Sequence, residues 1–409
     1  MEFLEIDEEE YLKFWNESPQ KTFLSSIEIG KLRQKSGWNI NYVGIKDNKS
    51  LVGVAMLTSH LRKLKKYEFY APRGILVDYN NTKYLNFFIK NLKKYLKQKK
   101  AYVFRMDPYV INKQRDIDGN IVNGGVNNKI IISNLEDLGF REVAVKNMEQ
   151  VGWMFSLDLK DKTEEEIMNE MKPNTRNTIK KTLKTGITIR ELKCNELDTF
   201  IDIMNSTGER KNFSVRKLSY YQEMYNLFKN KKEIKYLVTE LDLKKLNKKL
   251  VAEQKSKRET LKKLNSAKYN DGKRKALNNE IDSYEKKIDE CTEIMKKTKK
   301  EKIILSGSMF IMVKPEIIYL SSGNYDEYMH FNSQYLLQWE MIKYGIENGF
   351  AKYNFYGIPA NINTKPKDYG IYEFKRGFNG YVEELIGEYE LPLSFTYYIF
   401  NIIHKIKRK

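Results

Sequence analysis

The sequence predicts an α/β fold in two units, with a helical arm inserted into the second. At 409 residues the chain is long for a single hydrophobic core, so two domains are expected. Strand-like and helical segments follow one another in both halves, and a lysine-rich helical pattern interrupts the second half. We therefore divide the chain into residues 1–150, residues 151–240 with 301–409, and an arm at 241–300.

The first unit reads as an α/β arrangement. Residues 1–35 are predicted to be helical, 111–127 to be a loop and 128–138 to be a helix. An amphipathic helix is expected over 82–98, because its apolar residues recur at helical spacing on one face. The segments with strand patterns are 41–45, 51–61, 65–72, 75–77 and 101–105. This strand–strand–helix–strand order indicates an α/β unit.

The second unit shows similar elements without a detectable sequence repeat. Residues 162–184 are predicted to be helical with a break at Pro173, because proline cannot continue a helix interior. Further helices are expected at 198–207, 218–229 and 328–348. The segments with strand patterns are 154–159, 236–241, 303–313, 316–321 and 353–356.

The arm is predicted to be an antiparallel coiled-coil hairpin with its turn at 270–272. It holds 19 Lys and Arg against 10 Asp and Glu, and so supplies +9 of the net charge of +19. Its second half has apolar residues at alternating spacings of four and three, the pattern of a heptad seam, at Leu277, Ile281, Tyr284, Ile288, Cys291 and Met295. The basic surface is either a solvated spacer or a contact for RNA phosphates.

Composition narrows the class of protein. A net charge of +19 and a pI near 9.4 favour polyanionic partners such as tRNA, a phosphate-bearing substrate or an anionic membrane surface. Cys194 and Cys291 are far apart, so reduced thiols and a cytoplasmic location are expected. The three histidines lie in no hydrolase or zinc pattern, and we predict neither a metal nor a cofactor. No signal peptide or membrane-spanning run is apparent.

The stretch 353–380 is the strongest candidate site. A short aromatic strand is followed by a Pro/Asn/Lys/Gly-rich loop at 358–370 and then by Lys375 and Arg376, which stand between Phe374 and Phe378. This order is typical of a lidded site for an anion. The alternative is an ordinary hairpin whose two cations point into water.

Two further patterns carry cations. Lys172, Arg176, Lys180 and Lys184 recur every four residues on one predicted helix face, where their mutual repulsion would be relieved by a bound polyanion. A solvated face is the alternative, and a tRNA-binding face is the interpretation that we favour.

The second pattern pairs Arg216 with Tyr220. The forked N–H donors of the guanidinium and the neutral tyrosine hydroxyl are both suited to phosphate, although an isolated Arg–Tyr spacing is a weak signal. Asp107 precedes Pro108, which holds its backbone extended beside Tyr102 and Tyr109. The aspartate either caps a turn or belongs to a substrate cleft. Tyr319, before a Ser-Ser-Gly turn, is a candidate for lining an acyl pocket.

Several motifs together resemble the Fem family, the aminoacyltransferases that build peptidoglycan cross-bridges. The similarity covers nearly the whole chain in family order. It includes APRGILVDY (71–79), RMDPY (105–109), LDLKDKT (157–163), RKLSYY (216–221), QWEMIKYGIENG (338–349), YNFYG (353–357) and GIYEFKRGF (370–378). The resemblance implies two acetyltransferase-like subdomains of the GNAT type and an arm like that of the FemA-type members.

The resemblance also implies roles for single residues. Lys375, with Phe374, would sit at the aminoacyl end of the donor, and Asp107 would be a candidate base in the substrate cleft near Tyr102. Arg216 and Tyr220 would bind the diphosphate of the cell-wall precursor. Arg33, followed by Trp38, takes the place of a lysine that the family uses for the same diphosphate, with Ile29 where the family commonly has Trp.

The expected reaction is transfer of Gly, Ser or Ala, with Gly favoured, from aminoacyl-tRNA to the stem peptide of lipid II, to a growing bridge, or to UDP-MurNAc-pentapeptide. A fixed cation would stabilise the oxyanion of ester aminolysis, and the tRNA hydroxyl could carry the proton. The alternatives are an acyl-CoA N-acyltransferase, whose pyrophosphate loop we do not find, and a non-catalytic RNA-binding protein. The tail at 395–409 is either a packing helix or a peripheral membrane-surface helix.

Overall fold

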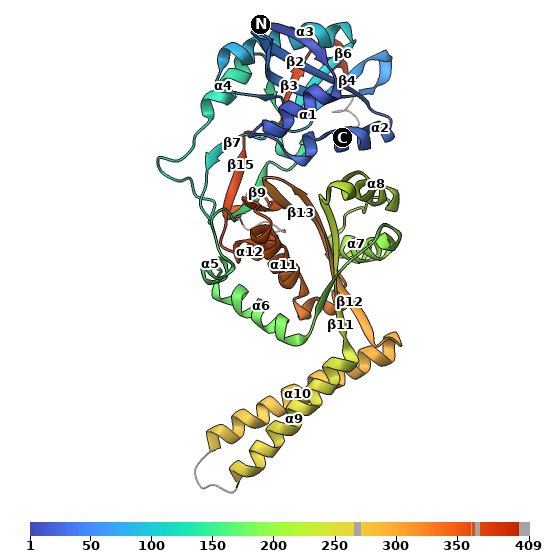
Figure 1. Ribbon diagram of the computed structural model, residues 1–409, viewed down its shortest axis with the longest axis vertical. Helices are drawn as coiled ribbons and strands as arrows, with labels where there is room; N and C mark the ends of the chain where they lie inside the picture. Colours follow the sequence, from blue (N-terminus) through green and yellow to red (C-terminus); the bar gives the residue numbers. More distant parts are fainter. Residues whose placement is uncertain (266–270, 361, 365–368, 401–409) are drawn as a thin grey trace.

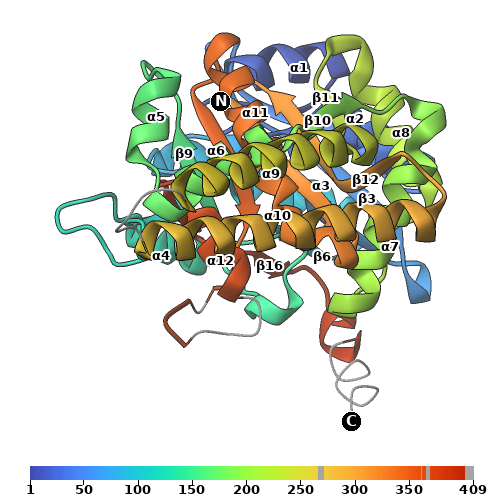
Figure 2. The ribbon, with the colours of Figure 1, turned by 90° about the horizontal axis from the view of Figure 1, so that it is seen from below.

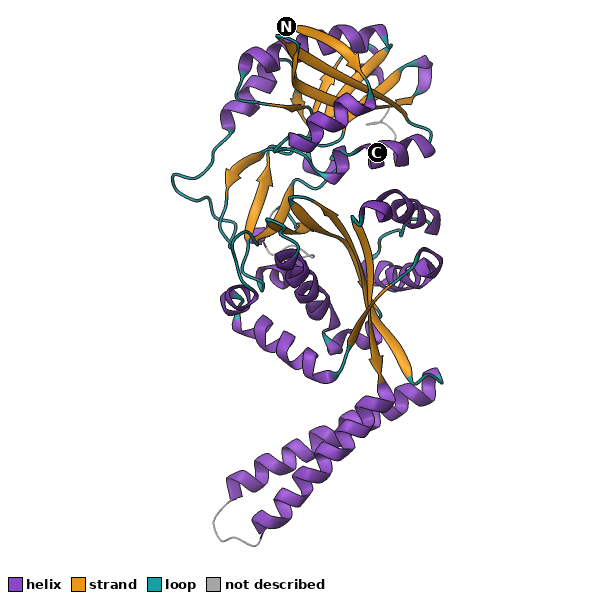
Figure 3. Ribbon diagram, in the orientation of Figure 1, coloured by secondary structure: helices purple, strands orange, loops and turns teal. Residues whose placement is uncertain are grey.

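The computed structural model describes residues 1–265, 271–360, 362–364 and 369–400. In that part of the chain, the strands form two sheets of eight strands each, and helices flank both sheets. Figure 1 and Figure 3 show the two sheet units one above the other, with a pair of long helices projecting from the second unit. The predicted α/β fold class is confirmed.

The first sheet has the strand order β1-β2-β3-β4-β6-β16-β8, with β5 paired to β3. Helices α3 and α4 cover one face and α1 and α2 the other. The helices are α1 (Glu8–Glu17), α2 (Ile27–Lys35), α3 (Thr82–Gln98) and α4 (Lys129–Asp137), and the strands are β1 (Glu2–Ile6), β2 (Asn39–Asp47), β3 (Ser50–Leu61), β4 (Tyr67–Ala71), β5 (Leu76–Val77), β6 (Ala101–Met106), β8 (Arg141–Glu142) and β16 (Tyr389–Pro392).

The second sheet has the order β10-β11-β12-β13-β14-β9-β15-β7. Helices α7 and α8 cover one face, and α5, α6, α11 and α12 contribute to the core on the other. The helices are α5 (Glu164–Glu170), α6 (Pro173–Thr185), α7 (Leu197–Lys211), α8 (Leu218–Phe228), α11 (Ser333–Glu347) and α12 (Tyr369–Arg376), and the strands are β7 (Ile111–Gln114), β9 (Trp153–Asp158), β10 (Thr188–Glu191), β11 (Ile234–Asp242), β12 (Lys302–Val313), β13 (Glu316–Asn324), β14 (Lys352–Gly357) and β15 (Tyr381–Leu385).

The two sheets are built alike. In the first, an antiparallel run β1 to β4 is followed by a parallel partner, β6, and α3 lies between them in the chain. In the second, β10 to β13 are antiparallel, β14 is the parallel partner, and α11 lies between β13 and β14. A parallel pair needs a long crossover, which a helix supplies. The sequence shows no repeat, yet the architecture repeats.

Strands cross between the two halves of the chain. Strand β7 pairs with β15 in the second sheet, and β16 near the C-terminus pairs with β6 in the first. The division into folding units at residue 150 stays a prediction, and each sheet takes a strand from beyond that boundary.

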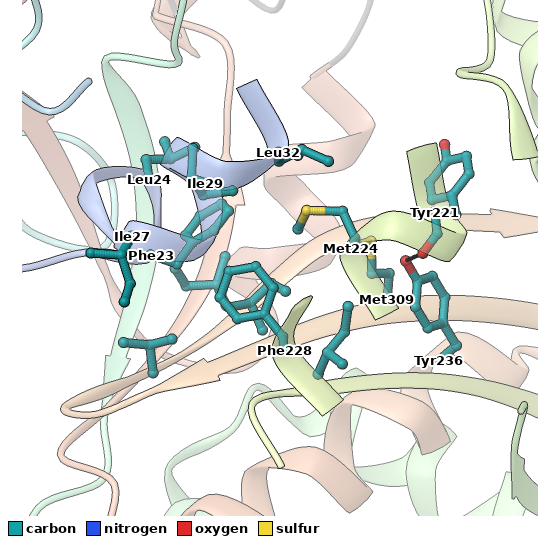
Figure 4. Packing of buried hydrophobic residues seen from close by; sticks show 14 of the residues in the cluster. Phe23, Leu24, Ile27, Ile29, Leu32, Tyr221, Met224, Phe228, Tyr236 and Met309 are labelled. Carbon is teal, nitrogen blue, oxygen red and sulfur yellow. Dashed lines mark hydrogen bonds between the residues drawn. The ribbon is translucent and has the colours of Figure 1, made fainter. Parts of the chain in front are cut away.

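A shared apolar core holds the two units together. The short 3₁₀ helix η1 (Phe23–Ser25) and helix α2 place Phe23, Leu24, Ile27, Ile29 and Leu32 against α8 and the second sheet, and Figure 4 shows them facing Tyr221, Met224, Phe228, Tyr236 and Met309. Burial of each large apolar side chain contributes about 1.5–3 kcal/mol. The relative position of the two units, on which the site depends, is therefore set by a well-packed core.

The prediction that residues 1–35 are helical throughout was wrong at the start. Residues 2–6 form β1, an edge strand paired with β2. The strand ends at Asp7, whose Oδ1 accepts from the Glu10 backbone N–H at 2.7 Å and caps α1. Composition alone does not distinguish this edge strand from the acidic helix that follows it at once. The signal that would identify the strand is its pairing with β2, which lies about 40 residues away in the sequence.

Two other predicted elements differ in detail. Part of the predicted loop at 111–127 is strand β7. The predicted helix at 328–348 is divided into η6 (Asp326–Phe331) and α11, because Asn332 between them has a left-handed backbone with φ of 55°.

Residues 369–376, which carry Lys375, form a helix and not a hairpin strand, and the loop before it lies partly outside the described residues.

The arm consists of α9 (Leu243–Asn265) and α10 (Asp271–Thr298), which lie side by side in Figure 1 and Figure 2. Leu246 and Leu250 of α9 share a core with Ile303, and with Cys291 of the predicted seam. The predicted turn falls partly on residues outside the described part, and Asp271 and Gly272 already belong to α10. None of the described helices combines the length and apolar character that crossing a bilayer requires.

Candidate functional site

A cluster of cations and aromatic rings lies where the two units meet. The Arg33 guanidinium carbon is 5.2 Å from the centre of the Trp38 ring and 5.0 Å from that of Tyr70. The Tyr70 hydroxyl donates to Asp107 Oδ1 at 2.6 Å. The predicted residues Arg33 and Trp38 are thus in contact, and Tyr70 connects them to Asp107.

Asp107 is buried and held from several sides. Its Oδ1 also accepts from the Arg73 backbone N–H at 2.9 Å, and its Oδ2 is 3.3 Å from the Arg73 guanidinium. Burial raises the pKa of Asp107, and the charge of Arg73 and the two hydrogen bonds oppose that rise. Both carboxylate oxygens therefore face groups of the first unit, which is the arrangement of an anchor. The role of Asp107 as a base stays a prediction.

Arg73 joins the two units. Its side chain is buried, its guanidinium donates to the Val151 carbonyl at 3.2 Å, and it lies 5.5 Å from the centre of the Tyr109 ring. It also lies near Tyr356, where its positive charge and hydrogen bond oppose the burial that raises the pKa of the tyrosine. The backbone of Arg73 is left-handed, with φ of 58°. Such a conformation is uncommon for a residue with a side chain and is seen where surrounding contacts enforce it.

The predicted pair Arg216 and Tyr220 belongs to the same junction. The Arg216 guanidinium carbon lies 4.7 Å from the centre of the Tyr220 ring. Burial raises the pKa of Tyr220, and the charges of Arg216 and Arg33 both oppose it. Two arginines from different units therefore act on one hydroxyl, which makes a site with several hydrogen-bond donors.

A cavity of about 540 Å³ lies in the second unit. The residues that line it include Tyr319, Gln334, Tyr335, Tyr356, Phe374 and Lys375. The structure thus brings three of the predicted residues, Tyr319, Phe374 and Lys375, into one cavity. Tyr356 belongs both to its lining and to the neighbourhood of Arg73. It therefore connects the cavity with the junction cluster, the name we give to the group formed by Arg33, Trp38, Tyr70, Arg73, Asp107, Arg216 and Tyr220.

Lys375 is the buried cation of this cavity, with 5% of its surface exposed. Its Nζ donates to the carbonyls of Gly357 at 2.6 Å and Tyr356 at 3.3 Å. Burial, together with the smaller effect of the Lys211 charge, lowers the pKa of Lys375 to about 7. The ammonium is thus positioned by two backbone carbonyls, and none of the described residues offers it a carboxylate partner, which suits it to an incoming oxyanion.

The local sequence explains how Lys375 reaches the cavity. Tyr372 and Lys375 lie on the buried face of α12. The chain then turns at Gly377 and Gly380, where a Cβ atom would overlap Thr175 of α6 and the carbonyl of Ser156 in β9 respectively. Glycine at these two positions allows α12 to pack tightly against both elements.

The walls of the cavity are fixed by polar contacts. The Tyr319 hydroxyl donates to Ser322 Oγ and lies 3.4 Å from Gln334 Oε1. The Gln334 amide nitrogen donates to the Gly323 carbonyl at 2.9 Å. The Phe374 ring meets the Tyr335 ring edge-on at 4.8 Å. The lining therefore combines rigid aromatic faces with neutral hydrogen-bonding groups.

Among the predicted substrate-binding residues, Tyr102 is the one that lies outside both the junction cluster and the cavity. Its hydroxyl lies 3.5 Å from Glu68 Oε2, and its ring packs edge-on against Phe400 at 4.8 Å. Glu68 also lies 3.7 Å from Arg105, which is paired with Glu388 at 2.6 Å. Tyr102 thus belongs to a separate polar network that adjoins the junction cluster, and its binding role stays a prediction.

The four basic residues at 172–184 lie on or just before α6. Thr175, Ile179 and Thr182 form its buried side, and Lys180 and Lys184 are exposed. At one end, the Lys172 N–H donates to the Gly377 carbonyl at 3.0 Å, and at the other, Lys249 of the arm donates to the Lys184 carbonyl at 2.6 Å. Helix α6 therefore connects the base of the arm with α12 and its buried lysine.

Sequence reasoning missed three contributors to the site. Arg73 stands alone in the apolar run 71–77, and an isolated charge in such a run is a signal that a buried partner exists. Tyr356 has a left-handed backbone, with φ of 64°, that no pattern indicates. Lys352 lies 3.2 Å from Glu316 and 3.0 Å from Glu383 in a buried network, and carried no signal. Among the described residues, no cluster of His, Cys, Asp and Glu could hold a metal ion.

Comparison with known proteins places this arrangement in a family. The FemAB family matches residues 6–405. Aminoacyltransferase FemA of Staphylococcus aureus strain MRSA252 is 29% identical over 422 residues, covering 100% of this chain and 99% of the relative, and that of strain RF122 / ET3-1 is 28% identical over 419 residues with the same coverage. The crystal structure of FemX is 25% identical, with a TM-score of 0.75, and covers 98% of this chain and 99% of its own. The chain therefore belongs to the FemAB family and is an aminoacyltransferase.

Proposed function

We propose that this enzyme moves an amino acid from aminoacyl-tRNA to the amino group of the lipid II stem peptide or of a growing interpeptide bridge in peptidoglycan synthesis. The observation that carries the proposal is the cavity with its buried Lys375, joined through Tyr356 to the cluster of Arg33, Arg216 and Tyr220. The amino acid would be Gly, Ser or Ala, and the arm, a feature of FemA-type members, favours Gly.

The reaction is the aminolysis of an ester. The acceptor amine attacks the acyl carbonyl carbon, a C–N bond forms, and negative charge develops first on the carbonyl oxygen and then on the departing ribose oxygen. Charged Lys375 stabilises this developing charge more than the neutral ester, so it lowers the barrier. The C–O bond breaks, and the proton lost by the amine is taken up by the ribose oxygen. The step needs no strong protein base.

The junction cluster suits the diphosphate of the acceptor. Arg33 and Arg216 each offer a fork of donors, and Tyr220 adds a hydroxyl between them. Asp107 accepts a hydrogen bond from Tyr70, whose ring packs against Arg33, and Arg73 packs against the Tyr109 ring. This arrangement supports an acceptor whose anionic group lies at the junction and whose peptide extends toward Lys375. A lipid-linked acceptor and UDP-MurNAc-pentapeptide share this chemistry.

The tRNA body would follow the basic side of α6 and the arm. Lys180 and Lys184 are exposed, the contact of Lys249 with α6 makes the two basic surfaces continuous, and α6 ends beside α12. Cations spaced along such a path match a phosphate backbone. This continuity supports tRNA, with its acyl end at Lys375, as the donor.

A peripheral contact with a membrane surface belongs to the same proposal, because lipid II is membrane-anchored. Phe395 is 77% exposed and Tyr398 is 42% exposed beside it; residues 401–409, the basic end of the tail, lie outside the described residues. Exposed aromatic side chains next to cations are typical of interfacial binding. Phe395→Ser should lower the fraction of enzyme that sediments with phosphatidylglycerol vesicles several-fold, whereas Ile130→Ser, which removes an exposed apolar residue on α4, should not. Equal binding by Phe395→Ser and the unaltered enzyme would contradict this contact.

A transfer assay tests the function. Purified enzyme is mixed with labelled Gly-, Ser- or Ala-tRNA and with lipid II, with lipid II that already carries bridge residues, or with UDP-MurNAc-pentapeptide, and the products are followed by mass. We expect one donor and one acceptor to react. Failure with all acceptors, with the tRNA shown to be intact, would refute the proposal, and acetyl-CoA as a parallel donor tests the alternative N-acyltransferase.

A further inference from the structure

One wall of the Lys375 cavity is formed by the end of α7 and the residues that follow it. Arg210, Lys211 and Phe213 belong to the lining there, opposite α12 with Phe374 and Lys375. Three of the lining residues are cationic, and none of those that the structure describes is Asp or Glu. A concave surface with cations and without carboxylates attracts anions.

The three cations differ in what neutralises them. Arg210 is paired with Asp326 at 2.5 Å. The Lys375 ammonium donates to two backbone carbonyls, and no carboxylate partner for it lies among the residues that the structure describes. Lys211 is exposed, and within the described part of the chain its ammonium has no carboxylate partner. Two lysines that have no counter-charge among the described residues thus share one cavity, and an anion bound between them would relieve their repulsion.

An aromatic side chain accompanies Lys211. Phe213 lines the cavity with 43% of its surface exposed. An exposed aromatic face beside a cation is the arrangement with which proteins bind nucleotides, since each base stacks on such a face and its phosphate meets the cation.

The backbone holds this wall in place. Helix α7 ends at Asn212, whose left-handed conformation, with φ of 57°, turns the chain back. The Phe213 N–H then donates to the Gly208 carbonyl at 3.0 Å. A Cβ at Gly208 would lie 2.8 Å from the Phe213 carbonyl, so only glycine permits the close approach. Lys211 and Phe213 are therefore displayed on a fixed turn.

We propose that Lys211 and Phe213 bind the 3′-terminal nucleotide of the acyl donor, Lys211 through its phosphodiester and Phe213 by stacking on its base. This assignment rests on the proposed function, and it leaves Lys375 to interact with the acyl carbonyl. A cavity of about 540 Å³ falls in the size range of small-ligand sites, and so admits one nucleotide with its acyl group and excludes a duplex. The acceptor diphosphate carries the same phosphate chemistry, and the experiment separates the two sources.

The test measures binding by calorimetry, using non-hydrolysable donor analogues with an amide-linked amino acid. One probe is the dinucleotide cytidylyl-adenosine, with one phosphodiester, and the other is adenosine without phosphate. Lys211→Ala should weaken the dinucleotide about 10-fold and the nucleoside less than 2-fold, whereas Lys211→Arg should restore dinucleotide binding. Phe213→Ala should weaken both probes about 10-fold. Lys90→Ala, an exposed lysine on the remote helix α3, is the matched control.

The outcomes are distinct. An equal loss for both probes in Lys211→Ala, or no loss in either, overturns the assignment of the phosphodiester, and so does weaker binding of UDP-MurNAc-pentapeptide with unchanged dinucleotide binding. If the enzyme and its variants bind the two probes as expected, but the unaltered enzyme transfers to no acceptor, the nucleotide site stands and the proposed function fails. If it transfers and the two variants bind both probes normally, the site alone is refuted.

Discussion

Arg73 and Lys375 are both buried cations, with 2% and 5% of their surfaces exposed, but their surroundings differ. Arg73 faces Asp107, with 3.3 Å between the guanidinium and the carboxylate. Among the described residues, Lys375 donates to the carbonyls of Tyr356 and Gly357 and has no carboxylate partner. Two buried positive charges, separated in the fold by Tyr356, therefore have different electrostatic partners.

The partners decide what each cation can do. Burial alone would lower the pKa of Arg73, but Asp107 and nearby tyrosines outweigh it, and the guanidinium stays charged. Nothing outweighs burial at Lys375, and its pKa falls to about 7. A buried pair has both charges already compensated, whereas a buried cation without a counter-charge gains when an anion arrives. The comparison supports our proposal that Lys375 acts on the substrate, with Arg73 as a residue that positions the site.

The largest effect is expected from a substitution that breaks the buried Arg73–Asp107 pair. Arg73→Met should lower the free energy of unfolding by about 3–5 kcal/mol, because Asp107 would remain buried without its counter-charge. Arg73→Met combined with Asp107→Asn should recover a large part of that loss, and urea unfolding followed by circular dichroism measures both. A loss below about 1 kcal/mol in the single variant would show that the pair does not hold the junction.

The next largest effect is expected on the catalytic rate. Lys375→Met should lower kcat by about 10²–10³, the usual cost of removing one donor to a developing oxyanion. Its unfolding free energy should be unchanged or higher at pH 7, because an uncompensated buried charge is removed, and tRNA binding should barely change. Arg376→Met is the matched control, since that neighbouring guanidinium pairs with Glu373 and Asp118 outside the cavity. Full activity in Lys375→Met would show that this lysine does not stabilise the developing oxyanion.

A smaller effect concerns pH. The charged form of Lys375 declines as pH rises through about 7, so kcat/KM should lose an essential cation above that value, about 10-fold per pH unit at most. Because the charge of Lys211 lowers the pKa of Lys375, Lys211→Ala should move this descending limb to higher pH, whereas Lys211→Arg should leave it in place. A pH–rate profile checks this. A limb that moves to lower pH in Lys211→Ala would mean that a different group titrates.

The smallest effect concerns the exposed cations of α6, because solvent and salt screen their charge. Lys180→Ala with Lys184→Ala should weaken tRNA binding several-fold at low salt and reduce the slope of log affinity against log salt by about 1.4–1.8. Lys181→Ala, on the same helix beside that stripe, is the control. Filter binding across a salt series measures the slope. An unchanged slope would leave α6 as a solvated face.

Local patterns in the sequence determined a good part of this protein. The helix at 82–98 follows from its apolar stripe, the break between α5 and α6 from Pro173, and the arm from its four–three spacing. These features depend on residues a few positions apart, which is the range over which helical periodicity and proline geometry act. The motif around Phe374 and Lys375 likewise pointed to the cavity.

Only the tertiary structure decided the rest. Strand β1 is recognisable by its pairing with β2, β16 enters the first sheet from the far end of the chain, and Arg73 meets Asp107 across 34 positions. The lowered pKa of Lys375 needs its burial against β14, which no local pattern contains. The physical reason is that periodicity sets which face of an element is apolar, whereas strand partners and counter-charges come from segments that only the folded chain brings together.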